Sequence, residues 1–287
     1  MPAWTQTRIL AFLATRLPDL QVSEARPFAG GFWNDVQHLT TAQGDLVLKR
    51  YRPVPQGNLF PNLPQDEALA LTRLAGLQVA PDLVAFWPGD QVLLYRHIPG
   101  PEWQGDVRAA AQLLRQQSRA DPSGFRPVPV TAADILAQAD RILATCQRDP
   151  VTARLTACRP VPRPCDPGPI SLIHTDPAAA NLVGLGTGLR LIDWQCPAAG
   201  DLAEDVAVLM SPCFLTLYDR PLISPAQREV FLATLDDPAL TARLTVLEPA
   251  YNWRLACYCA QRSQTAPDPA LAARYGAAAL TQAAHLT

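Results

Sequence analysis

The sequence changes character at Ile98-Pro99-Gly100-Pro101, where the prolines interrupt regular structure. Before this break, short apolar runs alternate with turns that contain glycine and proline. After it, apolar residues recur mostly at the spacing of amphipathic helices. We therefore predict a small β-rich part, residues 1–97, and a larger, mainly helical part, residues 98–287, with a cleft at the hinge between them.

Apolar spacing and turn residues predict the elements of each part. The first part is expected to begin with a helix and to continue as an antiparallel meander, a second helix and a hairpin. These elements are a helix at 3–17, strands at 20–28, 35–41 and 46–51, a helix at 65–77, and hairpin strands at 83–86 and 91–95. The second part is expected to hold helices at 104–119 and 131–148, a Pro-rich loop at 158–169, short buried strands at 170–173 and 189–192, and mostly helix from 201 onward.

Composition excludes several classes of protein. Hydrophobic residues make up 48% of the 287 residues and charged residues 17%, which is typical of a packed globular chain. The net charge of −2 gives no reason to expect nucleic acid or an anionic membrane as a partner. The N-terminus lacks a signal-peptide pattern, and no apolar run approaches roughly 18 residues. Seven cysteines without paired C-x-x-C motifs are read as reduced thiols, so we expect a cytoplasmic protein.

Lys49 is the single lysine among 24 basic residues, all the others being arginines. One interpretation is a compositional bias towards arginine that happens to leave one lysine. The other is that this position needs a compact ammonium group, which the planar guanidinium of arginine cannot replace. The sequence around Lys49 is a β-rich run, so the side chain is expected on the third strand.

The densest polar cluster follows the apolar strand that ends at Ile173. It contains His174, Asp176 and Asn181, and a second apolar strand soon afterwards ends in Asp193. Two carboxylates and a carboxamide at the ends of neighbouring strands suit phosphoryl transfer, in which one Asp accepts the proton of an attacking hydroxyl. The Asn and the other Asp would hold Mg²⁺ through hard oxygen ligands.

The H-x-D-x-x-x-x-N spacing followed by an apolar run and Asp resembles the catalytic and metal-binding loops of kinases. Because Asp193-Trp194 stands in place of D-F-G, the chain looks like the aminoglycoside phosphotransferase and choline kinase family of small-molecule kinases. The resemblance spans roughly residues 25–210 and also rests on Gly31-Phe32-Trp33-Asn34, Lys49, Glu67, Gly200-Asp201 and Asp205. It implies a bilobal, protein-kinase-like α+β fold, with a small antiparallel-sheet N-lobe that carries one key helix and a larger, mainly helical C-lobe.

The resemblance also implies a role for each matching residue of the catalytic region. Asp176 is the catalytic base, and Asn181 and Asp193 are the ligands of Mg²⁺. His174 and Asp205 support the catalytic loop, with Asp205 accepting hydrogen bonds from the loop's backbone N–H groups. The alternatives from the residues alone are that Asp176 caps a turn, Asn181 is a turn residue and Asp193 is structural.

The nucleotide is expected to be ATP, bound largely by the first part. Lys49 reaches the α- and β-phosphates and Glu67 holds its ammonium in place, unless Glu67 is simply exposed to solvent. Gly31 belongs to a glycine loop whose backbone N–H groups would face the phosphates. Trp33 stands where this family often has Ser. The carbonyl of Arg96 and the N–H of Ile98 are expected to bind adenine, since Pro99 has no N–H.

The phosphate acceptor is less well specified than the nucleotide. In this family its pocket comes from C-terminal helices, and here the candidate residues share one helical face or adjoining faces. These candidates are Tyr251, Trp253, Arg254 and Tyr258, with Arg262 one turn further on. They are read either as a buried helix of the core, as an aromatic wall for a quaternary ammonium, or as an arginine site for an anionic or sugar substrate. No dense acidic run is present to bind an aminoglycoside.

The sequence therefore predicts an ATP- and Mg²⁺-dependent kinase that phosphorylates a hydroxyl of a small molecule. The acceptor is expected to be a choline- or ethanolamine-like amino alcohol, a sugar or an aminoglycoside-like compound, and the protein a monomer or homodimer. One alternative is a nucleotide-binding pseudokinase with a regulatory role. Another is a metal-dependent hydrolase that uses His174 and Asp176 as ligands, although the other histidines are scattered.

Overall fold

The computed structural model describes residues 4–28, 34–53 and 58–286. The chain forms two compact units: the first contains residues 1–100 together with 190–196, and the second contains 101–189 and 197–287. A single division between residues 97 and 98 would leave 190–196 in the second part. The composition of the sequence does not change around residues 190–196, so the sequence does not indicate that this segment belongs to the first unit.

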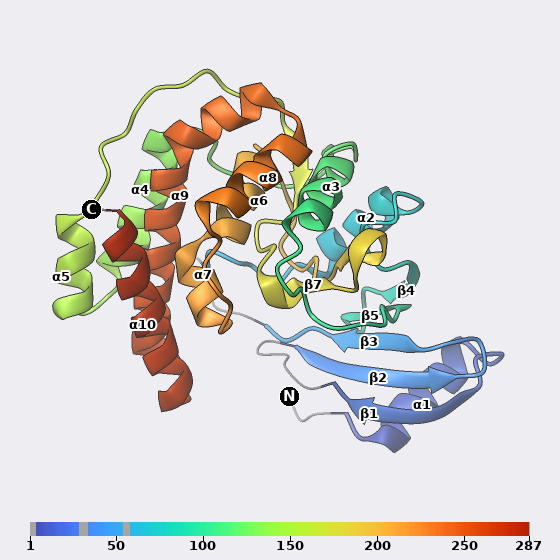
Figure 1. Cartoon of the computed structure of the whole chain (residues 1–287). Coiled ribbons are helices and arrows are strands. Elements are labelled where there is room, and N and C mark those ends of the chain that lie inside the picture. Colours follow the sequence, from blue (N-terminus) through green and yellow to red (C-terminus); the bar gives the residue numbers. More distant parts are fainter. Residues whose placement is uncertain (1–3, 29–33, 54–57, 287) are drawn as a thin grey trace. The chain divides into compact units, whose positions relative to one another are not determined.

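The first unit is built on a five-stranded antiparallel sheet with the strand order β1-β2-β3-β5-β4 (Figure 1). The strands are β1 (Val22–Pro27), β2 (Asp35–Thr41), β3 (Leu46–Arg50), β4 (Leu83–Trp87) and β5 (Val92–Arg96). β3 is the central strand, and all five of its residues are buried. The antiparallel sheet expected from the sequence is therefore confirmed.

Helix α1 (Gln6–Arg16) packs its apolar residues on one face of this sheet. The shared core includes Ile9, Phe12 and Leu13 of the helix and Leu39, Leu46, Leu48, Val92 and Leu94 of the strands. Successive side chains of a strand point to opposite faces. Lys49 therefore lies on the face opposite to Leu48, away from the core that α1 covers.

Helix α2 (Pro64–Leu74) is the second helix of the first unit. Pro64 suits the first position of the helix, because its ring fixes φ and the missing N–H is not needed there. Asp66 and Glu67 stand in the first turn, where negative charge interacts favourably with the helix dipole. The strand β8 (Arg190–Leu191) belongs to the returning segment of this unit.

The second unit is mainly helical (Figure 1). Its helices are α3 (Val107–Gln117), α4 (Ala132–Ala144), α5 (Pro150–Ala157), α6 (Ala203–Met210), α7 (Pro212–Leu217), α8 (Pro225–Leu235), α9 (Pro238–Thr265) and α10 (Pro269–His285). Its strands are β6 (Ser171–Ile173), β7 (Leu182–Val183) and β9 (Ala198–Gly200), and β6 pairs with β9 antiparallel. α9 packs against α4, α6 and α10, so its central part is buried.

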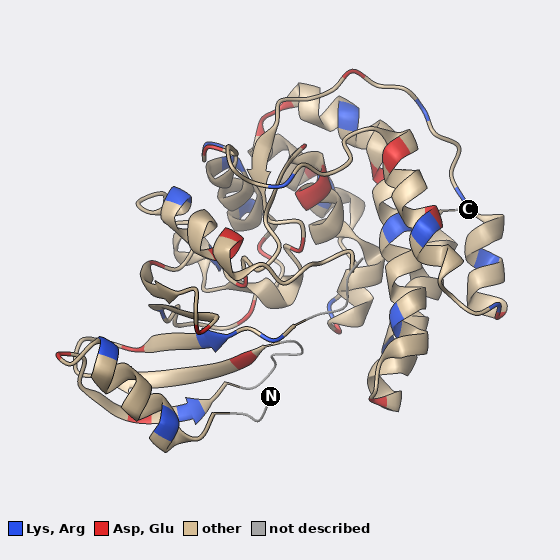
Figure 2. Ribbon diagram, turned by 180° about the vertical axis from the view of Figure 1, so that it is seen from behind, with Lys and Arg blue, Asp and Glu red and all other residues tan. Residues whose placement is uncertain are grey.

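Charged residues of both signs are interspersed along the ribbon of each unit (Figure 2). Among the described residues, no helix combines the length and the apolar character that crossing a membrane requires.

Candidate functional site

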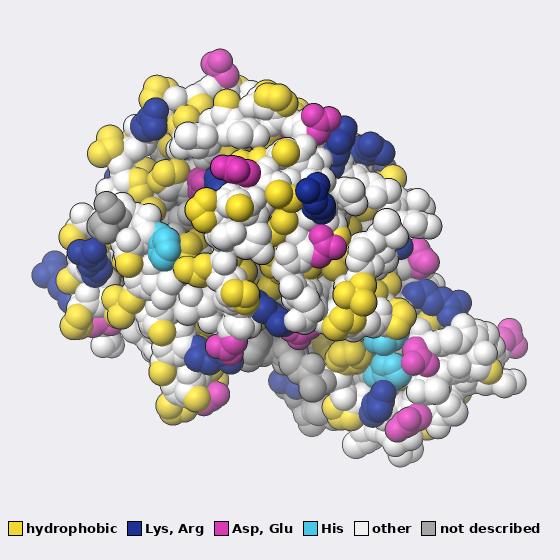
Figure 3. All heavy atoms as spheres, viewed as in Figure 1, with side chains coloured by type: hydrophobic (Ala, Val, Ile, Leu, Met, Phe, Trp, Pro, Cys, Tyr) yellow, Lys and Arg dark blue, Asp and Glu magenta, His cyan; other side chains and the backbone are white. Residues whose placement is uncertain are grey.

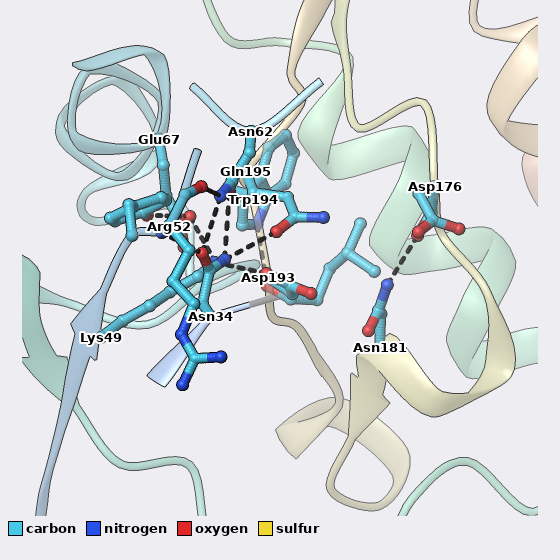
Figure 4. Close-up of polar contacts among 12 residues, drawn as sticks. Asn34, Lys49, Arg52, Asn62, Glu67, Asp176, Asn181, Asp193, Trp194 and Gln195 are labelled. Carbon is cyan, nitrogen blue, oxygen red and sulfur yellow. Dashed lines mark hydrogen bonds and ion pairs between the residues drawn. The ribbon is translucent and has the colours of Figure 1, made fainter. Parts of the chain in front are cut away.

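The centre of the candidate site in the first unit is the ammonium group of Lys49 (Figure 4). Its Nζ lies 2.6 Å from Oε2 of Glu67, and both side chains are almost fully buried, with exposed fractions of 2% and 1%. The ammonium also donates to the carboxylate of Asp193. The sequence prediction paired Lys49 with Glu67, and the structure places them in contact.

Electrostatic forces keep the Lys49 group ionised. Burial alone would lower the pKa of Lys49, but the negative charges of Asp193 and Glu67 raise it above its usual value. Burial raises the pKa of Glu67, and the charge of Asp193 adds to this rise, while the charge of Lys49 opposes it. The ammonium of Lys49 is therefore kept charged and is shared between two carboxylates.

Tyr51 completes the surroundings of Glu67 and was not predicted from the sequence. Its hydroxyl donates to Oε2 of Glu67, the same oxygen that accepts from Lys49. Tyr51 lies two residues beyond Lys49, immediately after β3, so the strand alternation that places Lys49 brings Tyr51 to the same side. That spacing is the signal that would have identified it.

Asp193 sits at a sharp turn of the returning segment. Its φ is +63°, in the left-handed region, which Asp tolerates better than most residues. Trp194 is fully buried behind it, and its Nε1 donates to the carbonyl of Leu191 at 2.8 Å. The Asp193 side chain remains 38% exposed, so its carboxylate can reach a ligand while Trp194 anchors the turn.

An amide cluster fixes Gln195, the next residue along. Asn34 Nδ2 donates to Oε1 of Gln195 and to Oδ1 of Asn62, each at 3.0 Å, and Asn62 Nδ2 donates back to Asn34 Oδ1 at 2.7 Å. The N–H of Leu63 donates to the Gln195 carbonyl at 2.8 Å. The segment that carries Asp193 is therefore tied to the start of α2. Only Asn34 belonged to a motif recognised in the sequence.

In the second unit, the loop after β6 is held by the buried carboxylate of Asp205. The backbone N–H groups of His174 and Thr175 each donate to it at 2.8 Å, and Gln117 Nε2 donates at 2.6 Å. Burial raises the pKa of Asp205 to about 7, while these hydrogen bonds oppose the rise. These backbone contacts are the support that was expected for Asp205. Gln117 was not predicted, because it lies in α3, far from Asp205 in the sequence.

Asp176 and Asn181 lie at the two ends of the same short loop (Figure 4). Nδ2 of Asn181 donates to the backbone carbonyl of Asp176 at 2.9 Å, and the N–H of Asp176 contacts Nδ1 of His174 at 3.3 Å. A one-turn 3₁₀ helix, Ala179–Asn181, sets the spacing. Because the amide nitrogen of Asn181 is used within the loop, its oxygen is the atom left to serve a metal ion.

The donors proposed for Mg²⁺ have the right chemistry. Asn181 offers a carboxamide oxygen from the second unit, and Asp193 offers a partly exposed carboxylate from the first. Mg²⁺ prefers oxygen ligands of this kind and binds through few protein groups together with substrate phosphates. Each of these side chains, taken by itself, therefore offers an oxygen atom of the kind that Mg²⁺ binds.

Three further residues, Gly31, Arg96 and Ile98, were predicted to bind the nucleotide. Gly31, with Trp33, lies outside the described residues. Arg96 is exposed at the end of β5 and donates its N–H to the carbonyl of Asp82 at 2.9 Å. Ile98 follows the strand and is half-buried. The assignment of Arg96 and Ile98 to adenine stays a prediction.

The predicted acceptor-binding side chains are part of the core of the second unit. Tyr251, Trp253 and Arg254 are at most 1% exposed, and Tyr258 is 4% exposed. Trp253 Nε1 donates to the carbonyl of Leu155 at 2.9 Å, and Arg254 forms a 2.6 Å ion pair with Glu204. Helix α9 is surrounded by other helices at this level, so its aromatic residues pack internally. This burial favours the packed-helix interpretation.

The charge of Asp176 acts on two tyrosines of the C-terminal helices, Tyr258 and Tyr275. Burial is the main reason for the raised pKa of Tyr258 and Tyr275, and the charge of Asp176 contributes to both. The guanidinium of Arg262 lies 5.6 Å from the ring centre of Tyr275 and opposes these shifts.

Comparison with known proteins settles the family. The model of the phosphotransferase enzyme family matches residues 24–244, well over half of the chain. The chain belongs to this family. This phosphotransferase has no significant match among curated protein sequences. The prediction of a phosphotransferase is confirmed.

Solved structures show the same fold at low sequence identity. Choline kinase LicA from Streptococcus pneumoniae is 15% identical with a TM-score of 0.65, covering 96% of this chain and 98% of its own. Aminoglycoside 2′-phosphotransferase-IIIa, solved with GDP, is 14% identical with a TM-score of 0.69 and coverages of 98% and 99%. Macrolide 2′-phosphotransferase MphH from Brachybacterium faecium is 19% identical with a TM-score of 0.58 and coverages of 94% and 96%. The predicted kinase-like fold is confirmed.

Proposed function

We propose that this phosphotransferase transfers the γ-phosphoryl group of ATP to a hydroxyl group of a small molecule in a Mg²⁺-dependent reaction. The observation that carries the proposal is the buried contact of Lys49 with Glu67 and Asp193 in a chain of this family. Lys49 and Glu67 are almost fully buried, and burying such an ion pair costs desolvation free energy that an apolar pair in the core would not.

In this proposal, Lys49 binds the α- and β-phosphates of the nucleotide. Glu67 and Tyr51 fix the position of the ammonium, so the phosphates meet a preoriented positive charge. Asp193 and Asn181 would hold Mg²⁺ through their side-chain oxygens, and the bound ion would supply positive charge to the phosphate oxygens.

Asp176 accepts the proton of the attacking hydroxyl. Its position is set by the loop that Asp205 holds and by the bond from Asn181 to its backbone carbonyl. His174 is fully buried and contacts the Asp176 N–H, which suits an orienting role rather than proton transfer. The carbonyl of Arg96, the N–H of Ile98 and the backbone of Gly31 complete the proposed nucleotide contacts.

Solved relatives contain purine nucleotides, which supports a nucleotide as the donor. LicA has been solved with AMP and the aminoglycoside 2′-phosphotransferase-IIIa with GDP. ATP is the donor we propose for this chain, because the charge on Lys49 and the oxygen donors of Asn181 and Asp193 suit a Mg²⁺-bound triphosphate.

We propose an acceptor with little positive charge, such as a sugar or a simple amino alcohol. The charges of Arg262 and Asp176 both act on Tyr258 and Tyr275, and a positive charge in this region would repel a compound with several ammonium groups. An aminoglycoside-like acceptor is therefore less favoured, and the cation-binding wall predicted from Tyr251 and Trp253 is buried.

The test is an ATP-consumption screen over choline, ethanolamine, thiamine, sugars, amino sugars and aminoglycosides. It compares the wild-type chain with Asp176→Asn, and Asp219→Asn in an exposed turn serves as the matched control. Wild type and control should phosphorylate at least one acceptor, and Asp176→Asn should lose about 10²–10⁴-fold in rate. If no acceptor is used and Mg-ATP still binds, the pseudokinase alternative is supported. If Asp176→Asn phosphorylates the acceptor as fast as wild type, Asp176 is not the base.

A further inference from the structure

Two histidines and an aspartate meet on the sheet of the first unit, where His38 pairs with Val47, two residues before Lys49 on β3. His38 lies on β2, Asp45 in the turn before β3, and His97 directly after β5. One ligand atom from each lies within 4.8 Å of the other two. Figure 3 shows histidine side chains gathered beside an acidic side chain over this sheet.

Backbone pairing holds the three residues in place. The N–H of His97 donates to the carbonyl of Asp45 at 3.0 Å, and the register places His38 opposite Val47 on the neighbouring strand. Val47 in turn pairs with Tyr95, two residues before His97. A site whose residues are set by strand register is held more precisely than one on free loops.

The side chains already face one another. Nε2 of His38 lies 3.1 Å from Oδ2 of Asp45, and the two imidazole rings are 4.8 Å apart in an edge-to-face arrangement. His38 is 5% exposed, and its Nδ1 is a buried nitrogen with no hydrogen-bond partner. The Asp45 side chain is 43% exposed, which gives an ion a path from solvent.

We propose that His38, Asp45 and His97 form a binding site for a divalent transition-metal ion of the Zn²⁺ class. Imidazole nitrogen and carboxylate oxygen are preferred ligands of such ions, which they hold at about 2.0–2.2 Å. Small side-chain rotations would bring atoms that are now within 4.8 Å to these distances around one ion. Three protein ligands leave a coordination position for water or a further ligand.

The surroundings are compatible with a bound cation. The ring of Phe28 contacts both histidine rings, with centroid distances of 5.9 Å and 5.7 Å, and forms an apolar wall. Burial lowers the pKa of His97, which favours the neutral imidazole that binds metals. Arg26, opposite His38 in the register, adds a positive charge that the Asp45 carboxylate offsets.

The test is Zn²⁺ titration of the full chain by calorimetry, after removal of metals by chelator and with excess Mg²⁺ present. Co²⁺ absorption spectra distinguish imidazole and carboxylate ligands from thiolates, which matters because the chain has seven free cysteines. The variants are His97→Asn and Asp45→Asn, the latter in an exposed turn. The control is His285→Asn, near the exposed C-terminal end of α10.

We expect one Zn²⁺ per wild-type chain and per control chain, with no thiolate signal in the Co²⁺ spectrum. Each of the two variants should weaken binding by at least about tenfold, while melting temperatures in chelator stay close to wild type. Absence of stoichiometric binding would mean that His38 and Asp45 form only a hydrogen-bonded pair. A thiolate signal, or unchanged affinity in either variant, would also overturn the proposal.

Discussion

The hydroxyl of Tyr51 donates to the carboxylate of Glu67 at the oxygen that also accepts from Lys49. The two donors approach from the same strand region, and all three groups are buried. Glu67 is thus held by two hydrogen bonds at one oxygen, and the position of the Lys49 ammonium depends on both.

Tyr51→Phe removes one of these bonds and keeps the ring. A hydrogen bond to a buried charged group is worth about 1.5–3 kcal/mol, so the free energy of unfolding should fall by that amount. Urea denaturation at neutral pH measures it. A stability equal to wild type would show that the hydroxyl does not support Glu67.

Lys49→Arg keeps the positive charge but places a larger group at a position where the native side chain is only 2% exposed. The guanidinium cannot meet Glu67 and Asp193 with the geometry of the ammonium, and a misplacement of this kind costs about 100-fold in kcat/KM. Steady-state kinetics with the acceptor found in the screen measures the change.

Arg16→Lys, in a partly exposed ion pair with Asp90, is the matched control and should leave kcat/KM unchanged. Full activity of Lys49→Arg would instead make the single lysine an accident of composition.

Asp205→Asn tests the support of the catalytic loop through the pH dependence of stability. The pKa of Asp205 is raised from its ordinary value of 3.8 to about 7, so the folded state binds this proton more tightly than the unfolded state. The contribution of Asp205 to the free energy of unfolding is therefore largest at low pH and is lost as pH rises towards 7. The free energy of unfolding changes by up to about 1.4 kcal/mol per pH unit in this range.

Because Asn does not titrate, the difference in unfolding free energy between wild type and Asp205→Asn should decrease from about pH 4 to pH 7 and then level off. Denaturation series at closely spaced pH values measure this difference. A difference that stays flat or increases across that range would contradict the assignment.

Trp253→Phe separates a core residue from an acceptor-binding one. The substitution removes the bond to the Leu155 carbonyl and part of a fully buried ring, so we expect a loss of about 1–3 kcal/mol in stability. The KM for the acceptor should not change. A raised KM for the acceptor with unchanged stability would indicate that Trp253 binds the acceptor.

Local sequence signals predicted much of the fold and the first contacts of the site. β2 was predicted with its observed bounds, and the contact of Lys49 with Glu67 followed from the family resemblance. Helix α5 was missed although Asp149 and Thr152 form a capping box around Pro150. The predicted helix at 131–148 ran through the turn that separates α4 from α5.

The remaining contacts join residues that are far apart in the chain. Gln117 and Asp205 are 88 residues apart, and Asn34 and Gln195 are 161 apart. Periodicity and motif spacing describe neighbours along the chain, so neither pair could be predicted from them. The burial of Trp253 depended in the same way on helices packed around α9, which one helix's own pattern does not specify.

The central claim is that Lys49, Asn181 and Asp193 bind a magnesium–nucleotide complex. Calorimetry of Mg-ATP with wild type and Asp193→Ala tests this claim without knowledge of the acceptor. We predict that wild type binds ATP more tightly with Mg²⁺ than without, and that Asp193→Ala weakens Mg-ATP binding by at least about tenfold. No Mg-ATP binding by wild type, or equal affinity in the two proteins, would contradict the account.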